Sequence, residues 1–294
     1  MDITSLGNQV MEGIPVTKKE AVWLYGQPVD KLCSQADKIR KAFCSDTFKL
    51  CTAICDRYMD GNLWIASNQK KLEERAKISY AQGLSNCSVG IGIESSEIEA
   101  FEQICQGVYQ MREKIPINVC VHAGILDENQ YKKIKKARVR RSYHDLQNIW
   151  HTLIQEKSTV YMNWLESVRS AEREGIPLCV GVSPGLEKEW KEHINMAFLF
   201  RKLKIRDVVF HIPFEASENP GTFLKRLKRN IALYRFILPY ANIRLGTGRG
   251  ILEDKGYSCF CAGVNGALTG DMLATAGITV EMDRERIEKM GYII

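Results

Sequence analysis

Two features are missing from this sequence: an apolar run long enough to cross a bilayer, and an apolar core within residues 1–13. A membrane-spanning helix needs about 20 mostly apolar residues, and a secretory leader needs a continuous apolar segment. We therefore expect a cytoplasmic protein with no membrane partner. Because a reducing compartment disfavours disulfides, the 10 cysteines are expected to serve packing, metal or iron–sulfur ligation, or catalysis.

No C-x-x-C pair, P-loop or Rossmann glycine fingerprint occurs either. Without a C-x-x-C pair the sequence lacks the usual spacing of a structural zinc site. Without a P-loop or Rossmann fingerprint it lacks the common phosphate-binding motifs. Glycine-rich segments are present at 181–185 and 246–250, and without those spacings we interpret them as tight barrel loops. The alternative is that their backbone N–H groups bind a phosphate or carboxylate.

Charge of one sign is not in large excess, since 41 Lys and Arg residues stand against 35 Asp and Glu residues. A mixture of this kind is typical of a solvated surface, whereas a nucleic-acid site gathers basic residues on one face. The dense basic stretch 132–141 predicts a charged helix that runs into a strand. We expect no nucleic-acid partner.

The 294 residues, 45% of them apolar, suffice for one large α/β barrel or two smaller domains. Strand-like segments alternate with amphipathic stretches such as 98–114, 159–174 and 222–238, which predicts a parallel sheet. Eight such units suit a (β/α)8 TIM-type barrel, and a doubly wound open sheet is the alternative. The predicted strands are 48–54, 87–92, 117–124, 139–145, 177–185, 207–214, 243–248 and 263–269.

Residues 17–43, ahead of the first strand, repeat apolar side chains at helical spacing, and Pro28 lies near a helix boundary. We therefore predict an N-terminal helical extension over 1–46, packed on an α/β barrel over 47–294.

Thiols and imidazoles stand on the predicted strands or near their C-terminal ends, where α/β barrels build active sites. Cys120 and His122 lie two residues apart on one strand and therefore share a face. Three thiols from nearby strands with one further polar side chain suit an iron–sulfur cluster, and the alternative is that each cysteine packs as a small hydrophobe. The candidates are Cys51, Cys55, Cys87, Cys120, His122, His144, Asp145, Cys179, His211 and Arg244.

Several segments, taken in order, form a pattern that covers nearly the whole chain. They are PVTKKEA at 15–21, FKLC at 48–51, NVCVHAG at 118–124, YHDL at 143–146, LCVGV at 178–182, PGT at 220–222, IRLGTGR at 243–249 and AGVNGALTGD at 262–271. Together these segments resemble biotin synthase and its relatives in the radical SAM superfamily.

The resemblance implies a (β/α)8 barrel, usually dimeric, with an auxiliary [2Fe–2S] cluster deep inside it. Biotin synthases hold that cluster through three cysteines and an arginine. The matching positions in this chain are Cys87, Cys120, Cys179 and Arg244.

The expected ligand pocket also differs from that of the family. Asp145 and His211 occupy positions where the family has amide side chains near the substrate. With His122 and His144 they would form a pocket for a small-molecule ligand other than dethiobiotin.

The motif that holds the SAM-cleaving cluster in the family differs in this sequence. Relatives hold a [4Fe–4S] cluster through C-x3-C-x2-C and leave one iron open for S-adenosylmethionine. Alignment on residues 48–51 puts Gly61, Ile65 and Asn68 at the three cysteine positions, and none of them offers a thiolate.

A second alignment gives an atypical cluster site. Cys51 and Cys55 then form the C-x3-C pair, Tyr58 stands at the third position, and Cys44 supplies the missing thiolate from before the strand. The alternative is that Cys44, Cys51 and Cys55 pack around an inactive site.

Three functions remain open from the sequence. The first is an iron–sulfur protein of cofactor or sulfur metabolism that keeps an auxiliary-type cluster without ordinary radical SAM chemistry. The second is an atypical radical SAM enzyme with its cluster on Cys44, Cys51 and Cys55. The third is a pseudoenzyme that pairs with an intact radical SAM protein through the dimer surface of the family.

Overall fold

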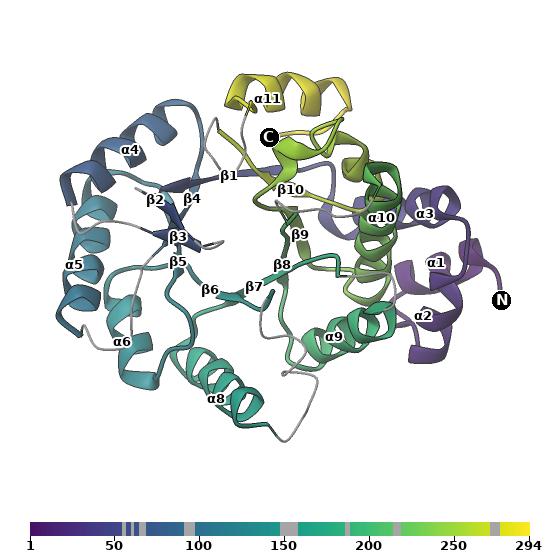
Figure 1. The fold of residues 1–294 in the computed structure, drawn as a ribbon, viewed down its shortest axis with the longest axis horizontal. Helices are drawn as coiled ribbons and strands as arrows, with labels where there is room; N and C mark the ends of the chain where they lie inside the picture. Colours follow the sequence, from purple (N-terminus) through teal and green to yellow (C-terminus); the bar gives the residue numbers. More distant parts are fainter. Residues whose placement is uncertain are drawn as a thin grey trace. The chain divides into compact units, whose positions relative to one another are not determined.

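A computed structural model describes residues 1–54, 57–59, 62–64, 69–90, 98–147, 158–185, 189–213, 219–270 and 277–294. Eight parallel strands form a closed barrel in the order β1-β10-β9-β8-β7-β6-β5-β4, with helices between successive strands (Figure 1). The predicted (β/α)8 barrel is therefore confirmed, and closure rules out the open sheet.

All eight predicted strands are present, each within a few residues of its expected bounds. A short antiparallel hairpin, β2 with β3, was not predicted and follows the first barrel strand. The strands are β1 Lys49–Ile54, β2 Arg57–Met59, β3 Asn62–Trp64, β4 Asn86–Gly90, β5 Asn118–His122, β6 Arg141–Asp145, β7 Leu178–Val182, β8 Asp207–Phe210, β9 Asn242–Leu245 and β10 Gly266–Leu268.

The helices that cover the strands agree with the amphipathic stretches of the sequence, and the basic stretch 132–141 spans the end of one helix and the start of β6. The helices are α1 Ile3–Met11, α2 Lys18–Tyr25, α3 Val29–Cys44, α4 Gln69–Ala81, α5 Ile98–Lys114, α6 Glu128–Lys136, α8 Thr159–Glu174, α9 Trp190–Lys202, α10 Pro220–Ile237 and α11 Val280–Lys289, with 3-10 turns η2 Arg249–Ile251 and η3 Tyr257–Ala262.

The residues expected to be helical, 17–43, form two helices, with the boundary near Pro28 as expected. A capping box begins α2, because the Thr17 hydroxyl accepts from the Glu20 amide at 3.3 Å and the Glu20 carboxylate accepts from the Thr17 amide at 2.7 Å. Pro28 then stands at the start of α3. Proline restricts the residue before it to extended backbone, so a continuous helix cannot pass through residue 27.

The chain divides into two compact units, residues 1–49 with 181–294, and residues 50–180. In the first unit α3 packs along α10, and α1 packs on α3 (Figure 1). The N-terminal helices therefore share a compact unit with the second half of the barrel.

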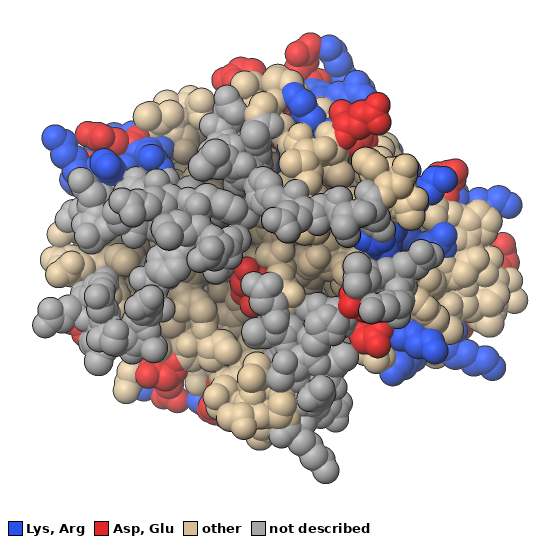
Figure 2. Space-filling model, viewed as in Figure 1, with Lys and Arg blue, Asp and Glu red and all other residues tan. Residues whose placement is uncertain are grey.

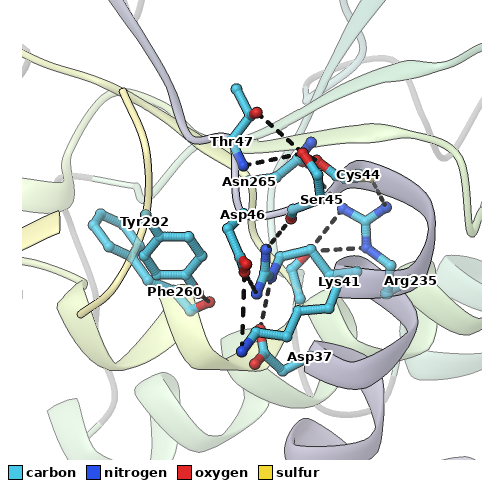
Figure 3. A network of polar contacts seen from close by, with 12 residues as sticks. Asp37, Lys41, Cys44, Ser45, Asp46, Thr47, Arg235, Phe260, Asn265 and Tyr292 are labelled. Atoms are coloured by element: carbon cyan, nitrogen blue, oxygen red, sulfur yellow. Dashed lines mark hydrogen bonds and ion pairs between the residues drawn. The ribbon is translucent and has the colours of Figure 1, made fainter. Parts of the chain in front are cut away.

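Buried Arg235 of α10 joins α3 to the strand ends of this unit (Figure 3). Its guanidinium donates to the Gly263 carbonyl at 2.7 Å, to Oδ1 of Asn265 at 3.0 Å and to the Ala241 carbonyl at 2.8 Å. It also lies 3.3 Å from Sγ of Cys44, at the end of α3. These partners satisfy a charge that would otherwise be costly to bury.

A second buried arginine, Arg40 of α3, holds the chain where it enters β1. It pairs with Asp37 at 2.7 Å, donates to the Ser45 carbonyl at 2.6 Å and stacks over the Tyr292 ring at 4.6 Å. The C-terminal segment then pairs with this entry, because the Phe48 amide donates to the Ile293 carbonyl at 2.7 Å.

Within the described ranges, no helix has the length and apolarity that a membrane span requires. On the face drawn in Figure 2, basic and acidic side chains are interleaved around the periphery. The picture agrees with the mixed charge of the sequence.

We predict that Asp283→Asn destabilises the protein by about 3 to 5 kcal/mol, because breaking a buried ion pair leaves an uncompensated charge. Asp283 accepts two bonds from Arg249, at 2.8 and 3.0 Å, and neither side chain is exposed. Chemical denaturation measures the loss. The matched control is Glu285→Gln, which removes an exposed pair with Lys289 and should cost far less stability. Equal losses in both variants would contradict the prediction.

Candidate functional site

The direction of the β6 side chains is set by His144. Its Nε2 lies 2.9 Å from the hydroxyl of Tyr131 on α6, and that hydroxyl lies 3.2 Å from Oγ of Ser167 on α8. His144 therefore faces the helices. Side chains alternate along a strand, so Tyr143 and Asp145 face the barrel interior.

The pairing of β5 with β6 shows which side chains of β5 face the interior. Val121 is paired with Ser142 and His122 with Tyr143. Paired residues of parallel strands point to the same face, so His122 and Cys120 face inward with Tyr143. The rings of His122 and Tyr143 meet edge to face with centroids 4.1 Å apart.

On β4 the register separates Cys87 from Cys120. Cys87 is paired with Val119, and Ser88 is paired with Cys120. Cys87 therefore faces the helices and Ser88 faces the interior. The resemblance predicted that Cys87 would join Cys120 and Cys179, but these thiols do not share one face of the sheet.

The surroundings of Cys87 agree with this direction. The residue is fully buried, and burial raises the pKa of its thiol far above the ordinary value, with Cys51 adding a smaller increase. The charge of Arg112, on helix α5, acts in the opposite direction. An apolar pocket against the helix layer disfavours a thiolate.

Two further thiols face inward in the same unit. Thr52 is paired with the helix-facing Cys87, so Cys51 points to the interior. The Ser142 amide donates to the Pro177 carbonyl at 3.1 Å, which aligns Cys179 with Tyr143. The inward faces of β1, β5 and β7 therefore carry Cys51, Cys120 and Cys179.

Cys51, Cys120 and Cys179 form no disulfide in the structure, and all three are buried. Among the residues that the structure describes, no three His, Cys, Asp or Glu side chains lie close enough to hold a single metal ion. A site for one zinc or iron ion is therefore not preformed in the described part of the chain.

The other unit holds Arg244 and His211. Arg244 of β9 pairs with Asp207 of β8 at 3.3 Å, and both side chains are nearly buried. Nδ1 of His211 accepts from the Thr247 amide at 3.1 Å, so the proton of the neutral ring sits on Nε2. Burial, aided by Arg244, lowers the pKa of His211 to about 4.

The glycine-rich loop after β9 is tight because backbone and side chains approach it closely. A Cβ at Gly246 would lie 2.6 Å from Nδ1 of His211, and one at Gly248 would lie 2.0 Å from the Ile212 carbonyl. Gly248 also has a φ of +81°. The segment packs as a close-fitting loop, in agreement with its interpretation from the sequence.

The proposed second cluster site is described only in part. Cys44 lies at the end of α3 with its Sγ beside Arg235 and the carbonyls of Pro239 and Ala241. Cys55 falls outside the described residues, as do the three positions matched to the C-x3-C-x2-C motif, Gly61, Ile65 and Asn68.

Comparison with known proteins agrees with the barrel and with the resemblance. Residues 205–293 match the family described as "Biotin and Thiamin Synthesis associated domain". The biotin synthase of Brachyspira hyodysenteriae is 29% identical over 323 aligned residues, covering 100% of this chain and 95% of the relative. Biotin synthase 2 of Corynebacterium diphtheriae is 28% identical, with coverage of 99% and 96%. The chain is thus similar to biotin synthases over its whole length.

Solved structures share the fold of this biotin-synthase-like chain. Methylornithine synthase superposes with a TM-score of 0.77 at 17% identity, covering 98% of this chain and 96% of that one. The FeFe-hydrogenase maturase of Carboxydothermus hydrogenoformans gives a TM-score of 0.74 at 16% identity, with coverage of 99% and 78%.

Sequence reasoning missed two inward positions of the biotin-synthase-like barrel, Ser88 and Tyr143. A signal for the first was present, because Asn86 and Ser88 alternate with apolar Cys87 and Val89. Had the apolar positions been assigned to the helix side, Cys87 would have been predicted to face outward.

We predict that the free energy of unfolding of His144→Gln falls less between pH 6.5 and pH 4 than that of the wild type. Burial lowers the pKa of His144 from 6.5 to about 4. In that window the unfolded chain binds a proton that the folded chain does not, so folding stability falls as pH is lowered. The wild type should lose about 3 kcal/mol more than the variant across the window.

Urea denaturation at a series of pH values measures this difference. His211 has a similarly lowered pKa and is present in both proteins, so its contribution cancels. Parallel profiles for the two proteins would contradict the prediction.

Proposed function

We propose that this biotin-synthase-like chain is an iron–sulfur protein that holds an auxiliary-type cluster inside its barrel. It would act on a small molecule or cluster in cofactor or sulfur metabolism, without ordinary radical SAM cleavage. The observation that carries the proposal is the set of buried thiols on the inward faces of β5 and β7, Cys120 and Cys179. The relatives named biotin synthases support it, since that family implies iron–sulfur clusters and S-adenosylmethionine.

The donor chemistry of the barrel interior fits such a cluster. Thiolates are the usual ligands of iron–sulfur clusters and are soft enough to prefer them over hard cations. A two-iron cluster takes its ligands at two separate iron atoms, so it does not require three side chains around one point. The absence of a preformed single-ion group in the described residues therefore does not oppose a two-iron cluster. When bound, the cluster would supply redox-active iron and inorganic sulfide.

The environment of Cys120 suits a buried cluster more than a solvent-exposed one. His122 and Tyr143 lie above it on the same inward face, with their rings in contact. Aromatic side chains at this place exclude water, and the solvent exposure of a cluster influences its reduction potential.

The sequence supports the loss of ordinary radical SAM chemistry. Gly61, Ile65 and Asn68 stand where relatives have the three thiolates, and no C-x3-C-x2-C motif occurs anywhere in the chain. Without three thiolates a [4Fe–4S] cluster has no ordinary anchor that leaves one iron open for S-adenosylmethionine.

We predict that anaerobically reconstituted protein carries iron and sulfide and that Cys120→Ala and Cys179→Ala each lose most of this content. Iron and sulfide analysis with visible absorption spectra measures it. Cys105→Ala is the matched control, because Cys105 is also buried in the same unit but lies on helix α5. Cluster content that is unchanged in the Cys120 and Cys179 variants would contradict the proposal.

We also predict that reconstituted and reduced protein forms no 5′-deoxyadenosine from S-adenosylmethionine. An intact biotin synthase treated in the same way serves as the positive control, and chromatography with mass detection measures the product. Formation of 5′-deoxyadenosine that disappears in Cys51→Ala and Cys55→Ala would instead support the atypical cluster site with Cys44.

A further inference from the structure

We infer that Cys51 of β1, together with Cys120 and Cys179, supplies the third thiolate of the inner cluster site, and that Cys87 is a packing residue. The inference rests on the proposed function and names the residue set of its site. It replaces the β4 cysteine, which the family pattern selects, with a β1 cysteine that the family pattern does not select.

The first support is the direction of the side chains. Thr52 and Cys87 are paired and face the helices, so their neighbours in sequence face inward. On β1 that neighbour is Cys51, and on β4 it is Ser88. An inward thiol is therefore available from β1, whereas β4 offers an inward hydroxyl.

The second support is the height of the thiols on β1 and β5. Ala53 is paired with Ser88, and Ser88 is paired with Cys120, so Ala53 is the residue of β1 in register with Cys120. Cys51 lies two residues before Ala53 and points to the same side. The strands of a (β/α)8 barrel are tilted, so residues paired on neighbouring strands differ in height along the barrel axis by about one residue. Two side chains at the same height on alternate strands are therefore about two residues apart in register. That offset brings Cys51 level with Cys120.

The same offset, in the same direction, brings Cys179 to this level. Cys120 is paired with Arg141, and the bond from Ser142 to Pro177 aligns Arg141 with Pro177. Cys179 lies two residues beyond that partner. Barrels of this kind fill their interior with layers built from alternate strands, and β1, β5 and β7 are alternate strands of this barrel. The three thiols therefore belong to one interior layer.

The third support is that Cys87 is poorly placed for ligation. Its paired neighbours Val119 and Thr52 lie on the helix side, and Val89 follows it on the same face with no exposed surface. Apolar surroundings favour the neutral thiol over the thiolate that binds iron. The sheet itself separates this thiol from Cys120.

The test compares Cys51→Ala with Cys87→Ala in the full-length protein, reconstituted anaerobically beside the wild type. Iron and sulfide content, visible absorption and the EPR spectrum of the reduced protein are measured, together with thermal unfolding before reconstitution. We expect Cys87→Ala to keep the wild-type content and spectrum and Cys51→Ala to lose most of both.

A further variant keeps the test decisive if Cys51→Ala does not fold. Cys51→Ser preserves the size of the side chain and offers oxygen in place of sulfur, so it should shift the absorption of any cluster that remains, whereas Cys87→Ser should not. Loss of the cluster in the Cys87 variants, with full content in the Cys51 variants, overturns the inference and leaves the proposed function standing. Failure of the wild type to bind any cluster overturns the proposed function and the inference with it.

Discussion

The alternation of side chains across β4, β5 and β6 decides which groups meet inside the first half of the barrel. The alternation is anchored by the contact of His144 with Tyr131, which fixes one residue of β6 toward the helices. The paired registers then pass that direction from strand to strand. A slip of one residue in the pairing would turn Cys87 to the interior and Ser88 to the helices. The register therefore decides which side chains line the interior of the barrel.

Polar groups on the helix side of the barrel serve structure more than binding. His144 belongs to this class, although its position at a strand end makes it a natural candidate for a ligand pocket. Its ring lies between β6 and the helices α6 and α8, with Tyr131 and Ser167 as neighbours. Arg40 and Arg235 stabilise the packing around α3 in a similar way. Each guanidinium donates hydrogen bonds to several backbone carbonyls or carboxylates at once. Buried guanidiniums that are paired in this way favour a single packing arrangement.

Residues 61–68 contain no cysteine, and similarity to biotin synthases extends over the whole chain. The barrel interior has thiols on β1, β5 and β7. Packing alone does not require three buried thiols on alternate strands, because small apolar side chains pack equally well at such positions.

The sequence by itself determined the eight strands alternating with helices, because strand and helix patterns are local properties of the chain. Closure of the sheet into a barrel, in place of an open sheet, was decided by the tertiary structure. It also placed Cys120 and His122 on one face, since two residues of one strand need no partner strand to be related. Only the tertiary structure decided that Cys87 faces the helices and that Cys51 faces inward. That choice depends on the pairing of β1, β4 and β5 and on the contact of His144 with a helix, which are interactions between segments far apart in the sequence. A strand pattern gives the period of the side chains but not which face the core takes, because both faces of a barrel strand are buried.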